Sequence, residues 1–187
     1  MRKHLITATL YTIVTTVLLG LVYPLVVTGM ARVLFRDKAE GQIVVENGRA
    51  VGSHIIAQPF TGDKYFHPRP SAAGANGYDA TNSGGSNYGP TNQKLIDRVG
   101  ASVGAANASG GQGAVPIDMV TTSASGLDPD ITPANAEFQA ARVALARHMK
   151  LEDVRALIRQ HTAPRQLGVL GEPRVNVLEL NLALDGT

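Results

Sequence analysis

The feature that most constrains this chain is a long stretch without charge near its N-terminus. From Leu5 to Ala31 the sequence contains no Asp, Glu, Lys or Arg. A helix over this stretch is about 40 Å long, which exceeds the roughly 30 Å hydrocarbon core of a bilayer. The core helices of soluble proteins rarely stay uncharged for so long. We therefore predict a cytoplasmic tail at residues 1–4, a transmembrane helix at residues 5–35 and one extracytoplasmic domain at residues 36–187.

A cleaved signal peptide is the main alternative for this stretch. The apolar part of a signal peptide is usually about 7–15 residues long and is followed by a site of the small-x-small type. The stretch here is about twice as long, and residues 26–31 make a poor cleavage site. We interpret it as a retained signal anchor.

The charges that flank the anchor decide its orientation only weakly. Arg2 and Lys3 precede it, and Arg32, Arg36 and Lys38 follow it, so counting positive charge gives a near tie. The very short N-terminal tail favours an N-terminus in the cytoplasm and an exported domain. The absence of cysteine fits either side of the membrane. The expected location is the inner (plasma) membrane, crossed once.

Small and weakly polar side chains form a stripe on one face of the predicted helix: Thr9, Thr12, Thr16 and Gly20. Membrane helices associate by close packing at such stripes. The alternative, left open, is that a membrane helix simply tolerates threonine. Pro24 predicts a kink in the outer third of the helix.

The domain itself is nearly neutral. The segments that flank the anchor hold five of the 17 basic and two of the 15 acidic residues, which leaves 12 basic and 13 acidic residues from Gly41 onward. Binding of nucleic acid through a basic surface is not supported.

Strand and helix patterns mix in the domain without regular alternation, which predicts an α+β fold. Asn47-Gly48 between two β-branched runs indicates a hairpin. Further strands are expected at residues 115–120 and 175–184. Helices are expected at residues 93–106, from the Thr132 cap to about residue 149, and from residue 151. Between the hairpin and the first of these helices, Gln58–Asn92 reads as a long irregular loop, and its aromatic residues indicate order.

Signatures of catalysis are mostly missing from the chain. There is no Gly-Lys pair for a phosphate-binding loop, and no Gly-x-Ser-x-Gly. The five histidines lack the spacing of metal ligands. Asp118, Asp128 and Asp130 could include an acid–base pair, although a turn before a helix explains the last two better. An exported hydrolase that uses Ser123 or Ser125 with His67 and Asp118 stays open as the alternative to a non-enzymatic protein. No metal site is predicted.

Four segments resemble one family closely. They are FTGDKYFHPRPSA (Phe60–Ala72), SGGSNYGPTN (Ser83–Asn92), the stretch Val115–Arg147 with SASGLDP, and LGEPRVNVLELNLALD (Leu170–Asp185). Together with the anchor they make the chain similar to the KdpC subunits of the bacterial high-affinity potassium-transporting ATPase.

The resemblance implies a non-catalytic accessory subunit of a potassium pump. Its partners would be a channel-like potassium-binding subunit, a P-type ATPase subunit and a small membrane peptide. The family is described as a catalytic chaperone that raises the affinity of the ATPase subunit for ATP, and the corresponding glutamine here is Gln139. ATP is implied by this resemblance alone, and no cofactor is otherwise expected. The Ser-Gly-Gly-Gln at Ser109–Gln112 lies between the matching segments and is given little weight.

Membrane topology opposes direct contact with ATP. With the N-terminus inside, about 30 Å of hydrocarbon separates Gln139 from cytoplasmic nucleotide. We therefore favour a structural and coupling role, in which the domain caps the outer mouth of the potassium-binding subunit. The aromatic loop would dock there, unless its aromatic residues simply pack on their own domain. The residues expected at partner interfaces are Phe60, Tyr65, Phe66, Arg69, Pro70, Ser71, Ser83, Gly84, Gly85, Ser86, Asn87, Pro90, Ser123, Ser125, Gly126 and Asp128.

Overall fold

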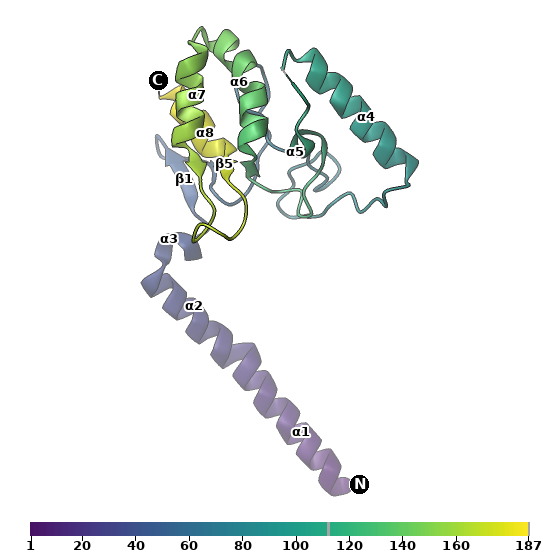
Figure 1. Cartoon of the computed structure of the whole chain (residues 1–187). Helices are drawn as coiled ribbons and strands as arrows, with labels where there is room; N and C mark the ends of the chain where they lie inside the picture. The colour runs from purple at the N-terminus through teal and green to yellow at the C-terminus, as the bar shows by residue number, and fades with distance from the viewer. Residues whose placement is uncertain (112, 187) are drawn as a thin grey trace. The chain divides into compact units, whose positions relative to one another are not determined.

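A computed structural model describes residues 1–111 and 113–186 of the chain, which divides after Ile43 into two compact units. The first unit is helical, and the second mixes helices with short strands (Figure 1). The predicted α+β class is confirmed.

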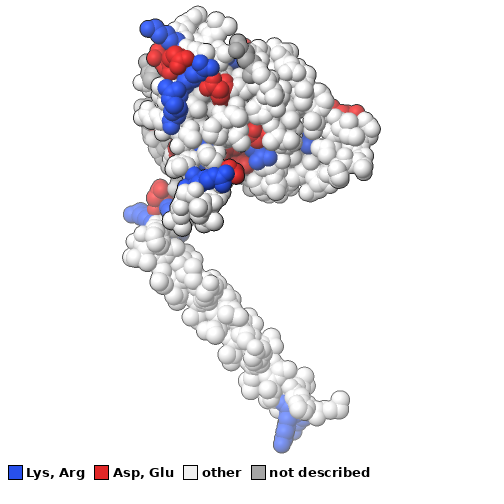
Figure 2. All heavy atoms as spheres, viewed as in Figure 1, with Lys and Arg blue, Asp and Glu red and all other residues white. Residues whose placement is uncertain are grey.

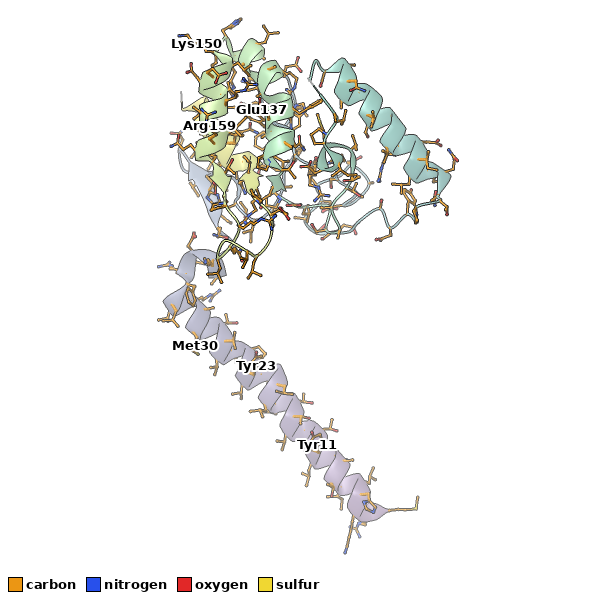
Figure 3. The ribbon with its side chains drawn as sticks, viewed as in Figure 1. Tyr11, Tyr23, Met30, Glu137, Lys150 and Arg159 are labelled. Atoms are coloured by element: carbon orange, nitrogen blue, oxygen red, sulfur yellow. The ribbon has the colours of Figure 1, made fainter. Side chains whose placement is uncertain are left out.

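The first unit is one long apolar helix with an irregular turn inside it. Helix α1 (Arg2–Val17), a π-helical turn (Leu18–Val22) and helix α2 (Tyr23–Leu34) follow one another without a break, and the short helix α3 (Arg36–Ala39) comes next. From Arg2 to Leu34 this helix is long and apolar enough to cross a membrane. None of its residues is buried, and charged side chains gather only near its two ends (Figure 2). Tyr11 and Tyr23 point away from its axis (Figure 3).

The π-helical turn ends at Val22, two residues before Pro24, and changes the backbone hydrogen bonding of the helix. The N–H of Tyr23 donates to the carbonyl of Leu18, so it no longer serves Leu19, its partner in an α-helix. Proline has no N–H, so Gly20 also loses its usual donor. Two consecutive acceptors therefore lack their α-helical partners in the middle of the apolar helix.

The hairpin predicted around Asn47-Gly48 is confirmed. Strands β1 (Ile43–Glu46) and β2 (Arg49–Ser53) pair with each other. Asn47 and Gly48 have φ of 50° and 77°. A positive φ at both central residues is what a tight two-residue hairpin requires.

The three predicted helices are confirmed as α4 (Gln93–Ala108), α6 (Pro133–Arg147) and α7 (Leu151–Gln160). Asn92 caps α4 by accepting from the N–H of Lys94, and Thr132 caps α6 by accepting from the N–H of Asn135. Helices α6 and α7 pack against each other (Figure 1).

A small antiparallel sheet lies beneath this helix pair, with β5 (Arg174–Asn176) between β3 (Asp130–Ile131) and β4 (Thr162–Ala163). Val175 pairs with Ile131 on one side and with Thr162 on the other. The buried core joins α6, α7, the sheet and the last helix: Phe66, Ile131, Ala136, Ala140, Val143, Ala144, Val154, Ile158, Val175, Val177, Leu180 and Leu184.

The strand predicted at residues 115–120 is wrong, because Ile117–Val120 forms the short helix α5. Pro116 precedes it in an extended conformation, and the helical turn directs the carboxylate of Asp118 inward, where it is buried. A short apolar run fits a strand and a buried helix equally well in sequence, and here a tertiary contact decided between them.

The strand predicted at residues 175–184 is also wrong beyond Asn176, because Val177–Asp185 forms helix α8. The side chain of Asn176 accepts from the N–H of Glu179 and so caps the helix. The buried residues of α8 recur at helical spacing: Val177, Leu178, Leu180, Asn181 and Leu184. The apparent alternation of Leu180, Leu182 and Leu184 misled the sequence interpretation.

The loop Gln58–Asn92 contains no helix or strand, and two buried amide side chains hold it in place. Asn181 of α8 accepts from the N–H of Phe66 (2.8 Å) and donates to its carbonyl (2.9 Å). Gln139 of α6 likewise accepts from the N–H of His67 (2.8 Å) and donates to its carbonyl (3.0 Å). We call this arrangement the amide clamp. It satisfies the backbone of two consecutive residues of the loop, and it lets Phe66 enter the core fully buried.

Replacing Asn181 with alanine tests the amide clamp. The substitution leaves both backbone groups of Phe66 buried without a partner, and each such group costs about 1–3 kcal/mol. We expect the free energy of unfolding to fall by about 3 kcal/mol. Thermal or denaturant unfolding of the full chain in detergent measures this. Asn107→Ala, at an exposed position of α4, is the matched control and should change little. Equal stability of the two variants would contradict the role of the clamp.

Candidate functional site

Three of the four segments that carry the family resemblance meet on one face of the domain. The carbonyl of Ser125 accepts from the hydroxyl of Ser83 and from the N–H of Gly84, both at 2.9 Å. The hydroxyl of Ser71 donates to the carbonyl of Gly126 at 2.6 Å. We call this set the motif cluster: Arg69, Ser71, Ser83, Gly84, Gly85, Ser86 and residues 122–128.

Glycine is required where the chains cross in the motif cluster. Gly126 has φ of 67°, and a Cβ added to it would lie 2.6 Å from the carbonyl oxygen of Gly84 and 2.8 Å from the nitrogen of Ala73. A Cβ on Gly85 would lie 3.0 Å from the carbonyl oxygen of Ala124. The SGGSN and SASG motifs are therefore fitted to one another backbone to backbone.

An ion pair fixes the edge of the motif cluster. Nη1 of Arg69 lies 2.9 Å from Asp128, and its Nη2 donates to the carbonyl of Thr122 at 3.3 Å. The other carboxylate oxygen of Asp128 accepts from the N–H of Asp130, which is the turn contact that the sequence suggested. Burial raises the pKa of Asp130, although the nearby guanidinium of Arg174 opposes this.

Asp118 has a structural position at the start of α6. Its carboxylate accepts from the N–H of Thr132 (2.7 Å), from the hydroxyl of Thr132 (3.0 Å) and from the amide of Asn135 (3.1 Å). A carboxylate buried at the positive end of a helix and bonded in this way stabilises that end.

The alternative hydrolase needs its serine, His67 and Asp118 in direct contact, and the described residues do not form this arrangement. The hydroxyl of Ser125 accepts from the N–H of Leu127 and lies 3.4 Å from that of Ser123. The ring of His67 contacts the carbonyl of Gly62. Within the described residues no hydrogen bond joins either serine to His67, or His67 to Asp118, so the nucleophile–base pair that such chemistry needs is not formed. No group of His, Asp and Glu in the described part of the chain could hold a metal ion.

Gln139 has no free hydrogen-bonding group. It is 2% exposed. Besides the two bonds to His67, its oxygen accepts from Arg142 (2.7 Å) and its nitrogen donates to Asn135 (2.8 Å). All four positions of the amide are thus occupied within the domain.

A cavity of about 310 Å³ lies beside Gln139, lined also by Asp63, His67, Pro70, Met119 and Arg142. The guanidinium of Arg142 is used inside the domain, because it donates to the carbonyls of Asp63 and Tyr65 and to Gln139. Burial lowers the pKa of His67, so the ring resists becoming a cation. The cavity therefore offers phosphate little positive charge.

The remaining predicted interface residues differ in exposure. Phe66, Ser123 and Gly126 are buried, whereas Ser83, Asn87, Pro90 and Ser125 are exposed, and the others lie between. Tyr65 packs beside Phe60 and donates to Asp185, so these aromatic residues pack on their own domain. Gln112 of the Ser109–Gln112 motif lies outside the described residues.

The sequence did not predict three polar residues that organise this region: Asn135, Arg147 and Asn181. Arg147 binds the carbonyls of Lys64 and Leu184 and pairs with Asp185. The available signal was polar residues at buried positions of a helical repeat, such as Asn181 on α8.

Comparison with known proteins identifies the relatives of this chain. Residues 5–186 match the family described as KdpC, the K⁺-transporting ATPase c chain. The chain is 66% identical over its whole length to the potassium-transporting ATPase KdpC subunit of Koribacter versatilis, of which the match covers 96%. It is 57% identical to the KdpC subunit of Acidobacterium capsulatum over 98% of each chain. The KdpC subunit of Rhodospirillum rubrum is 58% identical over 91% of this chain and 89% of its own.

Substitution of Gly126 tests the close approach in the motif cluster. Gly126→Ala combines a disfavoured positive φ with a steric clash, so we expect it to lower the free energy of unfolding by about 3 kcal/mol or more. Gly89→Ala is the control, because a Cβ there meets nothing within 4 Å. Chemical denaturation compares the two, and a harmless Gly126→Ala would show that the crossing is loose.

The lowered pKa of His67 predicts a dependence of stability on pH. Folding favours the neutral ring, so its contribution is complete above the unfolded pKa of 6.5 and is lost as the pH falls through that value toward the folded pKa. The full chain should therefore melt at a lower temperature at about pH 5.5 than at about pH 7.5. In His67→Gln this difference should shrink, because glutamine does not titrate. An unchanged difference would assign the effect to other groups.

Proposed function

This chain belongs to the KdpC family, the c chain of K⁺-transporting ATPases, and from that membership we propose that it is a membrane-anchored, non-catalytic subunit of an ATP-driven potassium importer. Its partners are the potassium-binding subunit, the P-type ATPase subunit and the small membrane peptide of the same complex. The apolar helix from Arg2 to Leu34 supports anchoring, since it exposes its apolar side chains throughout.

The proposed orientation places the N-terminus in the cytoplasm and the domain outside. On this side of the membrane the domain is positioned to cap the outer mouth of the potassium-binding subunit.

The proposed role is structural coupling rather than contact with ATP, and the observation that carries it is the bonding of Gln139. The side chain that the family description connects with nucleotide is buried and holds the backbone of His67 through two hydrogen bonds. To reach a nucleotide, Gln139 would have to release that backbone. An exchange of this kind leaves buried polar groups without partners, which costs about 1–3 kcal/mol for each group.

The exposed rim of the motif cluster is the proposed docking surface of the domain. Ser83 and Ser125 of the cluster are exposed, as are the neighbouring Asn87 and Pro90, and the glycine crossings hold the framework that carries them. A rigid surface loses little conformational entropy on binding, so its polar groups can be recognised without a cost of ordering.

In the membrane, the stripe of Thr9, Thr12, Thr16 and Gly20 is the proposed packing face. Thr15, outside the stripe, donates its hydroxyl to the carbonyl of Tyr11, whereas the described residues show no such bond for the three stripe threonines. We expect a neighbouring helix to contact the hydroxyl groups of the stripe and the carbonyls of Leu19 and Gly20, which lack their α-helical donors. In hydrocarbon, such groups need partners.

Copurification tests both the complex and the packing face. A tagged full-length chain, purified in mild detergent, should retain the potassium-binding and ATPase subunits, identified by mass spectrometry. Gly20→Leu should reduce their yield severalfold because its side chain prevents close approach of the helices. Gly29→Leu, on the same helix but outside the stripe, should not. A chain that purifies without any partner would refute the proposed function.

Protease added to spheroplasts tests the orientation. The domain should be digested while a cytoplasmic marker stays intact. Protection of the domain until the cells are lysed would place it in the cytoplasm and return contact with ATP to consideration.

A further inference from the structure

The segment between α7 and β5 forms a tight, ordered hairpin that projects beyond the helix pair (Figure 1). Gln166 and Leu170 exchange two backbone hydrogen bonds, each of 2.9 Å. At its base, Arg165 pairs with Glu172 and donates to the carbonyl of Gly171 at 2.7 Å. This bonding fixes the direction in which the tip points.

The tip of this hairpin is aliphatic and uncovered. Leu167 is 89% exposed, Val169 74% and Leu170 56%. An ordered segment that presents three large aliphatic side chains in four residues to water loses the free energy that burial would give. We call these three residues the apolar tip.

The backbone at the apolar tip is held in an unfavourable conformation. Leu167 and Gly168 have φ of 52° and 77°. Glycine and asparagine adopt a positive φ readily, whereas a leucine side chain does so rarely. Exposed aliphatic side chains and a strained leucine are both unfavourable for a surface that faces only water. Such features occur where a protein contacts a membrane or a partner.

We propose that the apolar tip inserts shallowly into the lipid surface beside the anchor. The inference rests on the membrane anchoring proposed above. Eight residues connect α2 to β1, and a chain of that length spans at most about 30 Å. The bilayer is therefore always within reach of the domain.

The size and chemistry of the apolar tip favour lipid over a protein partner. Three side chains cover far less than the roughly 800 Å² that each side of a stable protein interface buries. The tip contains none of the tyrosine, tryptophan or arginine that dominates protein interfaces. Its flanking charges, Arg165 and Glu172, neutralise each other. A tether removes the need for high affinity, so a small aliphatic insertion suffices to orient the domain.

The sequence contains no tryptophan and no cysteine, so single probes report without background. The full-length Leu167→Trp variant is incorporated into lipid nanodiscs made with ordinary or with brominated phosphatidylcholine and phosphatidylglycerol. Bromine quenches tryptophan that lies among acyl chains, so we expect the emission in brominated discs to fall about twofold. The matched control is Leu145→Trp, at a position of α6 that is 79% exposed, and its emission should not change.

The other outcomes of this experiment each contradict a different part of the proposal. A chain that fails to enter the nanodiscs contradicts the anchor itself, and with it the proposed function. A chain that enters but shows no quenching at position 167 overturns only the insertion of the tip. The tryptophan at position 167 could instead be shielded from water only in the assembled complex, without quenching by bromine. That result assigns the tip to a partner subunit and also overturns insertion.

A second probe guards against perturbation by tryptophan. A spin label on Val169→Cys should be more accessible to oxygen, which concentrates in the acyl region, than to a polar nickel chelate. Accessibility mainly to the nickel chelate would place the tip in water and contradict the proposal.

The strain at Leu167 is tested by a separate substitution. Asparagine adopts a positive φ more readily than leucine, so Leu167→Asn should raise the melting temperature by about 3 °C.

Discussion

The fold of the domain depends on how two residues of an irregular loop obtain their backbone hydrogen bonds. Phe66 is fully buried and His67 partly buried, so unpaired N–H and carbonyl groups there are costly. Among the described residues no strand pairs with them; instead Asn181 and Gln139 each offer one acceptor and one donor. Because these amides come from α8 and α6, the loop, both helices and the core around Phe66 become one cooperative unit.

The segments that carry the family resemblance have a largely structural role in the domain. HPRP, SGGSN and SASG contain residue types that suggest a binding site, yet most of their polar groups bind backbone within the domain. Gly126 allows two segments of the backbone to approach closely, and the ion pair of Arg69 and Asp128 holds the edge of that crossing. The same framework gives the exposed rim of the motif cluster a fixed shape, which is what docking to another subunit requires.

The helical unit differs from the domain in how its backbone polar groups are satisfied. In the domain, the amide clamp satisfies buried backbone groups internally, whereas the π-helical turn and Pro24 remove the α-helical donors of the Leu19 and Gly20 carbonyls. In water such groups would be solvated at little cost, but in hydrocarbon they favour a neighbouring helix. The exposed apolar tip of the domain fits the same setting, because aliphatic side chains that are unfavourable in water are favourable at a lipid surface.

The sequence by itself determined the features that depend on neighbouring residues. An uncharged run defined the apolar helix, Asn47-Gly48 the hairpin, the helical spacing of apolar residues α4, and the Thr132 cap the start of α6. It failed at α5 and α8, where short apolar runs fit either structure, although Asn176 and Glu179 carried a capping signal. It suggested Gln139 as a site residue but not the backbone of His67 as its partner. Only the tertiary structure decided that, because a buried amide is defined by groups distant in sequence: Gln139 meets His67, and Asn181 meets Phe66.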